Sequence, residues 1–362
     1  MKIKVIAFVF TTFVCSLVAK AEDYNFVKAN DNRYAYVGRI SFANPEKPTW
    51  DYPGAQIHCV FNGTSVRMLT KANSGYFMIE LDNQKPFKVE STPTDSLVLI
   101  AENLPDKQHR LTIIYCMEGL LRHPAFYGLY LDANRTLAER PQLPTRRIEI
   151  IGNSITCGFG IEGDGSEKEF SYSQENAYMS YAARTARALN AQWQLVSRSG
   201  IGVYRNNNGN VNGDKSVMPA YYPFTLFTTS GEKWDFSRYQ PDVVCVNLGT
   251  NDTTYPSYKV PLLTKAFCQF LQTLRTRYPN AKIVLLTGSM LKADSKRLQD
   301  LKQAEDEAVA EAKKRGDNEV YRLDFTPADG SLGWGTFRHP SMRQHELMAN
   351  ELTAYLKHIM NW

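Results

Sequence analysis

Cysteine is scarce in this sequence, with six residues in a chain of 362. The spacing is irregular, so it matches neither the paired C-x-x-C pattern of a zinc site nor the regular pattern of a disulfide framework. Two of these residues, Cys59 and Cys116, leave two interpretations open: a disulfide in an oxidising compartment, or two separate buried thiols. The cysteines therefore indicate neither a metal centre nor a fold that depends on several disulfides.

A strong excess of one charge is also missing. The formal net charge is +5, and it falls to +2 when Lys2, Lys4 and Lys20 are removed with the N-terminal segment described next. Lysine and arginine form no cluster, so the basic surface that nucleic-acid binding requires is not indicated. Beyond residue 21 no apolar run is long enough to span a bilayer, and we expect a mature chain without a membrane span.

The one long apolar run, from Val5 to Val18, has the pattern of an export signal. Lys2 and Lys4 precede it, and Ala19-Lys20-Ala21 offers an A-x-A cleavage site. The run is shorter than the roughly 20 apolar residues of a transmembrane helix. We therefore expect residues 1–21 to be a signal peptide and the mature protein to be exported, either periplasmic or secreted.

Residues 22–140 have the pattern of an all-β domain. Ala55–Phe61 alternates between apolar and polar residues and ends at Asn62-Gly63, a strong turn signal. We expect Ser65–Leu69 to be the hairpin partner of Ala55–Phe61. Further short strands with frequent turn signals follow, and this series predicts a sandwich or jelly roll.

The pattern changes after a short segment punctuated by prolines, residues 141–146, which we interpret as a linker. From residue 147 to 362, strands alternate with helices, as in a parallel α/β sheet. The expected strands are 148–151, 193–196, 243–248, 283–286 and 320–323, and the expected helices are 177–189, 258–277, 295–315 and 342–359. The many charges of the helix at 295–315, including those of Lys296, Asp300 and Glu305, are interpreted as a solvated face.

Ser154 stands at the end of the first of these strands. The apolar residues Ile148, Ile150 and Ile151 precede it, and Gly152-Asn153 breaks the run. The end of a strand in an open α/β sheet is where ligands bind. A serine there can be a nucleophile if a base takes its proton and donors hold the oxyanion, and the alternative is that it caps the following turn.

Three further residues follow predicted strands at the same edge. Gly200 offers a backbone N–H, with Gly202 as its rival, and Asn251 offers a side-chain amide. His339 offers a base. The pattern predicts acyl transfer in which Ser154 attacks, His339 takes its proton, and the oxyanion is held by Ser154 N–H, Gly200 N–H and the Asn251 amide.

Together these segments resemble the SGNH (GDSL-like) hydrolases. The motifs G-N-S-I-T-C-G-F-G, S-G-I-G-V-Y-R-N and R-H-P-S behind a β-sandwich are similar to carbohydrate esterase family 2. The resemblance implies a flavodoxin-like, three-layer α/β/α catalytic domain over residues 147–362 and a jelly roll over residues 22–140. It also implies an exported acetyl esterase that needs no metal or cofactor. The expected substrates are acetylated plant polysaccharides, xylan or glucomannan, or their oligosaccharides. The oligomeric state is not predicted.

Two positions depart from the family pattern. Asn153 replaces the aspartate that usually follows the first glycine, and Thr336-Phe337 stands where an aspartate usually orients the histidine. The resemblance therefore implies a Ser–His dyad in which a backbone carbonyl of the Gly333–Gly335 loop orients His339. Asp329 is the alternative, acting as the acid of a triad from farther along the loop.

Aromatic residues near the motifs are candidates for sugar binding, because a pyranose ring has apolar C–H faces. We expect Trp334, Tyr204 and Phe159 to contact substrate, with core packing as the alternative. Two other functions stay open: an SGNH esterase for another acyl ester, such as a lipid or an acetylated sialic acid, and a non-catalytic carbohydrate-binding protein. The presence of Ser154, Asn251 and His339 together argues against the non-catalytic alternative.

Overall fold

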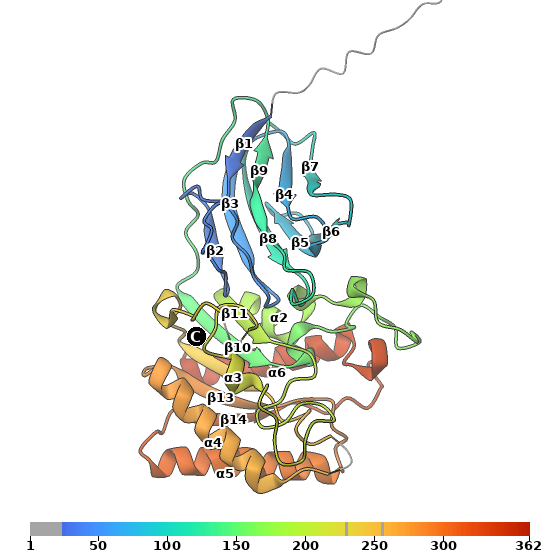
Figure 1. Ribbon diagram of the computed structural model, residues 1–362, viewed down its shortest axis with the longest axis vertical. Helices are drawn as coiled ribbons and strands as arrows, with labels where there is room; N and C mark the ends of the chain where they lie inside the picture. The colour runs from blue at the N-terminus through green and yellow to red at the C-terminus, as the bar shows by residue number, and fades with distance from the viewer. Residues whose placement is uncertain (1–23, 229–230, 255–256) are drawn as a thin grey trace, which may run out of the picture.

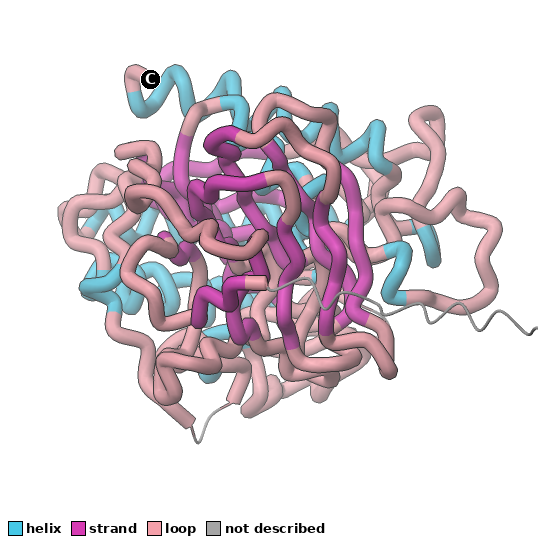
Figure 2. The backbone as a smooth tube through the Cα atoms, turned by 90° about the horizontal axis from the view of Figure 1, so that it is seen from above, coloured by secondary structure: helices cyan, strands magenta, loops and turns pink. Residues whose placement is uncertain are grey.

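The computed structural model describes residues 24–228, 231–254 and 257–362, so the expected signal peptide lies outside the described residues. Figure 1 shows an all-β part above an α/β part, along the long axis of the molecule. From above, in Figure 2, the strands lie over the middle of the molecule, with helices around and below them. None of the helices in the described ranges is long and apolar enough to cross a bilayer.

Two antiparallel sheets form the upper part. One has the strand order β1-β9-β4-β7 and the other β2-β3-β8-β5-β6. The strands are β1 (Asn25–Lys28), β2 (Ala35–Val37), β3 (Gln56–Gly63), β4 (Val66–Thr70), β5 (Gly75–Leu81), β6 (Phe87–Ser91), β7 (Leu97–Ala101), β8 (Lys107–Tyr115) and β9 (Phe126–Leu131). Alternate side chains point inward, so Phe61, Phe77 and Ile113 of one sheet pack with Leu129 of the other. The predicted sandwich is confirmed.

The expected hairpin between Ala55–Phe61 and Ser65–Leu69 is wrong. β3 pairs with β2 and β8, whereas β4 pairs with β7 and β9, so the chain crosses between the sheets after Gly63. The crossing is fixed by the Asp132 carboxylate, which accepts hydrogen bonds from Thr64 N, Thr64 Oγ1 and Ser65 Oγ. Alternation shows that each strand faces a core, but it does not show which strand pairs with which.

A five-stranded parallel sheet forms the centre of the lower part. Its order is β11-β10-β12-β13-β14, the flavodoxin-like order. The strands are β10 (Arg146–Gly152), β11 (Ala191–Ser197), β12 (Val243–Asn247), β13 (Lys282–Thr287) and β14 (Val320–Asp324). Gly152 is level with Ser197 on one side and with Asn247 on the other. The segments that follow these three strands therefore begin at the same edge.

Helices cover both faces of this sheet. α2 (Tyr181–Ala188) and α6 (Met342–Met360) pack on one face, and α4 (Val260–Arg277) and α5 (Lys296–Lys314) pack on the other. The short elements are α1 (Ser154–Cys157), α3 (Met218–Tyr221) and the 3₁₀ turns η1 (Tyr172–Gln174), η2 (Ala177–Met179), η3 (Phe236–Arg238) and η4 (Thr336–Arg338). The predicted three-layer α/β/α domain is confirmed.

Two details of the helices differ from expectation. The expected helix at 177–189 is the 3₁₀ turn η2 followed by α2, because Ser180 between them has an extended backbone with ψ of 159°. The charged residues of α5 do not all face solvent. Glu305 is fully buried and accepts a hydrogen bond of 2.6 Å from Thr287 Oγ1, and Asp300 is only 7% exposed.

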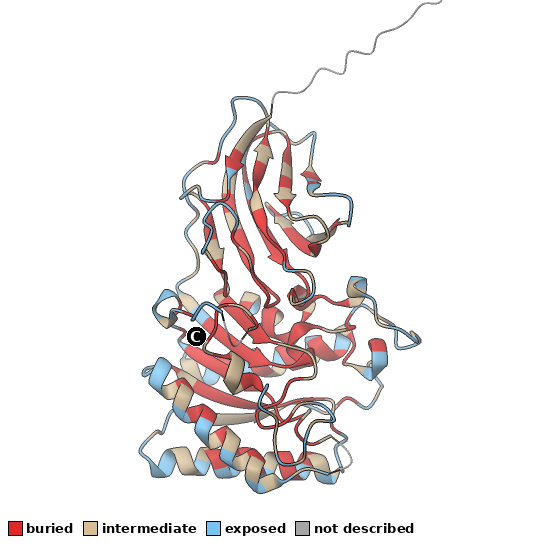
Figure 3. Ribbon diagram, in the orientation of Figure 1, coloured by how far each residue is buried: buried red, intermediate tan, exposed pale blue. Residues whose placement is uncertain are grey.

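The sandwich lies directly on the α/β part. Figure 3 shows buried residues running through the parallel sheet and across the junction. Gln56 Nε2 on β3 donates to the carbonyl of Trp193 on β11 over 2.9 Å. Arg39, from the segment after β2, is fully buried, 3.7 Å from the Glu149 carboxylate and 4.5 Å from the ring centroid of Tyr222.

Candidate active site

Ser154 is the first residue of α1, directly after β10. Asn153 caps this helix, because its Oδ1 accepts a hydrogen bond of 3.0 Å from Ile155 N. Asn153, and not Ser154, is therefore the N-cap of α1. Gly152 permits the sharp turn, since a Cβ there would lie 2.1 Å from Thr156 Oγ1. The Ser154 hydroxyl is left to point away from the helix.

His339 faces this hydroxyl. Its Nε2 lies 2.9 Å from Ser154 Oγ, and its Nδ1 lies 3.1 Å from the carbonyl oxygen of Thr336. A carbonyl only accepts, so Nδ1 carries the proton and Nε2 presents a lone pair to the serine. Burial lowers the pKa of His339 to about 4, which keeps the ring neutral near pH 7. This is the form that a general base requires.

The carbonyl that contacts His339 belongs to Thr336, one residue beyond the expected Gly333–Gly335 loop. The 3₁₀ turn η4 folds the chain so that the Thr336 carbonyl lies next to the imidazole ring of His339, three residues further along the chain. Phe337 and Arg338 adopt left-handed conformations, with φ of 53° and 58°. Such conformations cost energy for residues other than glycine, and they cluster at functional sites.

Asp329 does not contact His339. Its carboxylate is exposed and accepts hydrogen bonds from Ser331 N at 2.8 Å and Ser331 Oγ at 2.6 Å, which lower its pKa. Over the described ranges, the carboxylate–histidine pairs involve other histidines, His109 and His123. The geometry is therefore that of a Ser–His dyad with a main-chain acceptor.

Two loops beside Ser154 carry the expected oxyanion donors. Gly200 has φ of 76°, and no atom lies within 4 Å of where its Cβ would be. Its N–H has no hydrogen-bond partner among the described residues, whereas its rival Gly202 donates to Asn206 Oδ1. Asn251 Nδ2 donates to the Ile201 carbonyl over 2.7 Å, which orients the amide and leaves its second hydrogen for a ligand.

Sequence reasoning missed the function of Asp252 in holding these two loops together. Its buried carboxylate accepts hydrogen bonds from Val203 N, Tyr204 N, Arg205 N and Gly249 N at 2.7 to 3.0 Å. Burial raises its pKa, and the backbone donors Tyr204, Arg205 and Val203 act against that shift. The G-T-N-D motif was the available signal, although it suggested only a turn cap.

The aromatic residues expected to contact substrate differ in their burial and in their distance from His339. Tyr204 is only 6% exposed and packs in the core with residues of α4, and its hydroxyl accepts from Lys259 N, which is the arrangement that the core-packing alternative describes. Phe159 is half-buried, stacks on Phe170 and lies 4.6 Å from the His339 ring. Trp334 is also half-buried, and Phe337 beside the histidine is 50% exposed.

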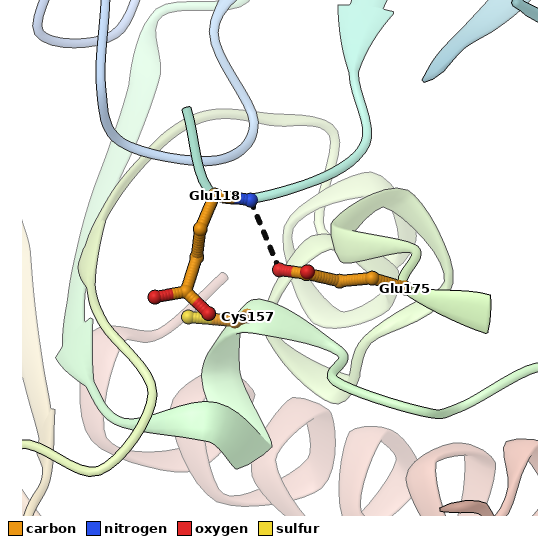
Figure 4. Close-up of side chains that lie close together, drawn as sticks. All are labelled: Glu118, Cys157 and Glu175. Carbon is orange, nitrogen blue, oxygen red and sulfur yellow. Dashed lines mark hydrogen bonds between the residues drawn. The ribbon is translucent and has the colours of Figure 1, made fainter. Parts of the chain in front are cut away.

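One cluster among the described residues has side chains that could hold a metal ion. Ligand atoms of Glu118, Cys157 and Glu175 lie within 4.8 Å of one another (Figure 4). Both carboxylate oxygens of Glu118 are already bonded to Ser199, and Cys157 Sγ is 3.3 Å from Ser197 Oγ. The ligand atoms of Glu118 and Cys157 are therefore already engaged in hydrogen bonds within the protein. Every described cysteine is a free thiol, so Cys59 and Cys116 do not form a disulfide.

A serine and a histidine in contact at the carboxyl edge of a flavodoxin-like sheet define an SGNH-type serine hydrolase. The GDSL-like lipase/acylhydrolase family model matches residues 150–351. The carbohydrate esterase 2 N-terminal model matches residues 36–141. The chain belongs to carbohydrate esterase family 2 and is a carboxylic ester hydrolase.

Similar proteins agree with this assignment. The chain is 35% identical over 345 residues to the cellulase/esterase CelE of Acetivibrio thermocellus, covering 94% of this chain but only 41% of CelE. It is 30% identical over 340 residues to an acetylxylan esterase/glucomannan deacetylase of Cellvibrio japonicus, covering 93% of this chain and 91% of that protein. Among solved structures, it resembles a family two carbohydrate esterase from Clostridium thermocellum in complex with cellohexaose. The TM-score is 0.84 at 35% identity, over 91% of this chain and 99% of that one.

Proposed function

We propose that this esterase is exported and removes O-acetyl groups from xylan or glucomannan, or from their oligosaccharides, through an acyl-enzyme on Ser154. The observation that carries the mechanism is the 2.9 Å contact between Ser154 Oγ and His339 Nε2, with Nδ1 held by the Thr336 carbonyl. The export part rests on the apolar run from Val5 to Val18 and the A-x-A site behind it.

The reaction follows from these positions. His339 Nε2 takes the Ser154 proton as Oγ attacks the acetyl carbonyl carbon. The negative charge on the carbonyl oxygen is held by the N–H groups of Ser154 and Gly200 and by the Asn251 amide. Collapse breaks the bond to the sugar oxygen, which receives the proton from His339. Water then attacks the acetyl-serine with His339 again as base, and acetate leaves.

The substrate class is supported by the surface next to the histidine. Phe337 is half-exposed, and its left-handed backbone is fixed by the same turn that supplies the Thr336 carbonyl. Together with Trp334 it offers apolar faces to a sugar ring. The relatives act on or bind such chains by name: an acetylxylan esterase/glucomannan deacetylase and an esterase in complex with cellohexaose.

The decisive experiment measures acetate release by the wild type and Ser154→Ala. The substrates are acetylated xylan, acetylated glucomannan, monosaccharide acetates and an aryl acetate. We expect release from the polysaccharides by the wild type and none by the folded Ser154→Ala variant, because among the residues that the structure describes no other hydroxyl contacts His339 Nε2. Ser173→Ala, which changes an exposed serine away from His339, is the matched control and should match the wild type.

Three outcomes would contradict the proposal. Substantial release by folded Ser154→Ala would remove this serine from the mechanism. Hydrolysis of the aryl acetate without release from any carbohydrate would indicate another acyl ester as the substrate. Binding of the polysaccharides without release of acetate from any substrate would indicate a non-catalytic carbohydrate-binding protein.

A further inference from the structure

A loop of the sandwich reaches the candidate active site. This loop joins β8 to β9, and Glu118 lies in it (Figure 4). Glu118 Oε1 accepts a hydrogen bond of 2.7 Å from Ser199 N, and its Oε2 accepts another from Ser199 Oγ. Both oxygens of the Glu118 carboxylate therefore accept hydrogen bonds from Ser199, a residue of the α/β domain.

Ser199 directly precedes Gly200, the expected oxyanion donor. The direction of the Gly200 N–H depends on the peptide plane that joins it to Ser199. Gly200 has φ of 76° and nothing beside its Cβ position, and its carbonyl accepts from Asn207 N over 2.8 Å, a contact on the following peptide plane rather than on this one. Glu118 accepts hydrogen bonds from both the backbone N–H and the side-chain hydroxyl of Ser199. Two contacts restrict the orientation of the Ser199–Gly200 peptide plane more than one contact would.

Glu118 is itself held firmly. Its N–H donates to Glu175 Oε1 over 3.0 Å, and the preceding Cys116 carbonyl accepts from Ala177 N over 2.7 Å. Burial raises the pKa of Glu118 and of Glu175, whose carboxyl groups lie close together. The hydrogen bonds from Ser199 lower the pKa of Glu118 and oppose the effect of burial, so the upward shift is larger for Glu175.

We propose that Glu118 is a positioning residue for the esterase reaction: through Ser199 it aims the Gly200 N–H at the transition-state oxyanion. The sandwich then completes the catalytic machinery of the other domain. This inference rests on the proposed function, because it needs Ser154 as the nucleophile and Gly200 as a donor. A contact that only joined the domains would change stability and leave the turnover of each folded molecule unaltered.

The test compares two substitutions of Glu118 by their kcat and KM on an aryl acetate. Glu118→Ala removes both acceptors, and we expect kcat to fall about 10- to 100-fold while KM changes less than about threefold. Glu118→Gln should recover most of the lost kcat, because its oxygen still accepts from Ser199 N and its amide donates to Ser199 Oγ. Leu121→Ala, in the same loop at a side chain 76% exposed, is the matched control and should match the wild type.

Active enzyme is counted by stoichiometric reaction of Ser154 with an organophosphonate, so that kcat refers to folded molecules only. Ser199→Ala removes the Oγ contact and keeps the backbone one, and we expect a smaller loss of kcat, about two- to tenfold. A wild-type kcat per titrated site in Glu118→Ala would overturn the inference, as would equal losses in Glu118→Ala and Glu118→Gln. The proposed function is tested separately: if Ser154→Ala is inactive while Glu118→Ala is normal, only the positioning of Gly200 by Glu118 is refuted.

Discussion

At the scale of single residues, the Thr336 carbonyl takes the position that an acid occupies in a Ser-His-Asp triad. It fixes the tautomer of His339 as an acid would, because it accepts only from a protonated Nδ1. It lacks the full negative charge that stabilises an imidazolium. The base is consequently well oriented but hard to protonate, which agrees with the lowered pKa of His339.

The pH dependence follows from this pKa. Only the neutral ring can accept the Ser154 proton, so activity is present above the pKa and lost as pH falls through it. With a pKa of about 4 for His339, kcat/KM on an aryl acetate should be level from about pH 5.5 to 8 and fall about tenfold per unit below pH 4. Re-assay at pH 7 after each incubation controls for unfolding. An acidic limb near 6.5, the ordinary value for histidine, would contradict the assignment.

Asn251 allows a second test at this scale. Asn251→Ala removes a side-chain donor to the oxyanion, and such a loss costs about 100- to 1000-fold in kcat. We expect KM to change much less, because the donor acts mainly in the transition state. Steady-state kinetics on an aryl acetate measure both values. Asn207→Ala, at an exposed asparagine of the neighbouring loop, is the control. A raised KM with normal kcat would make Asn251 a substrate-binding residue.

At the scale of elements, the site is made where two parallel strands end. The segments after β11 and β12 carry Gly200 and Asn251, and the Asp252 carboxylate ties them through backbone N–H groups on both sides. Hydrogen bonds to a buried charged acceptor are stronger than neutral ones. The two loops that carry the proposed donors are thus held together rather than independently.

Asp252→Asn should break this tie. An amide offers one acceptor and one donor group, so at least one N–H among Val203, Tyr204, Arg205 and Gly249 would face another donor. We expect the free energy of unfolding to fall by about 1–3 kcal/mol and kcat to fall at least about tenfold. Urea denaturation and steady-state kinetics measure the two effects.

Asp329→Asn is the matched control for Asp252→Asn, since the Asp329 carboxylate is exposed and its hydrogen bonds to described residues are confined to Ser331 in its own turn. It should keep nearly normal activity. A loss of several orders of magnitude would restore Asp329 as the acid of a triad, because an acid-to-amide change in a triad costs about 10⁴ in kcat. Normal kcat in Asp252→Asn would show that the two loops are held by other contacts.

At the scale of the whole molecule, the two domains share a buried charge pair. Arg39 of the sandwich and Glu149 of β10 are both fully buried, and the guanidinium carbon lies 4.5 Å from the Tyr222 ring centroid. Glu149 also accepts from the hydroxyls of Tyr222 and Tyr278. Such a pair costs desolvation when it forms, but the removal of one partner leaves the other charge uncompensated.

The prediction at this scale concerns stability. Arg39→Met should lower the free energy of unfolding by about 3–5 kcal/mol, and the double variant Arg39→Met/Glu149→Gln should recover a large part of that loss. Urea denaturation measures both. The control is Lys28→Ala, which breaks an exposed pair with Glu46 and should cost less than about 1 kcal/mol. A cost below about 1 kcal/mol for Arg39→Met would mean that the pair does not hold the domains together.

The sequence alone determined most of the elements, and it located Ser154 and His339, which lie in contact in the fold. A buried strand is a local apolar run, and the glycine or asparagine that ends it is a local signal, so Ser154, Gly200 and Asn251 could each be located without a structure. The alternating segments and turn signals of residues 22–140 predicted the sandwich, and the family motifs added the expected substrate class and the dyad. Alternation also identified β3 and β4 as strands, because side-chain burial along a strand has a period of two.

Only the tertiary structure decided how these pieces contact one another. The pairing of β3 and β4 depends on which sheet each joins, and the burial of Tyr204 depends on the packing of α4 over its loop. The partner of His339 is a main-chain carbonyl set by the backbone angles of Phe337 and Arg338, which the side-chain pattern does not reveal. Glu118 contacts Ser199 across 81 residues of sequence. The physical reason is the same in each case. These contacts depend on how distant segments pack and on local backbone conformation, and neither packing nor backbone conformation produces a periodic pattern in the sequence.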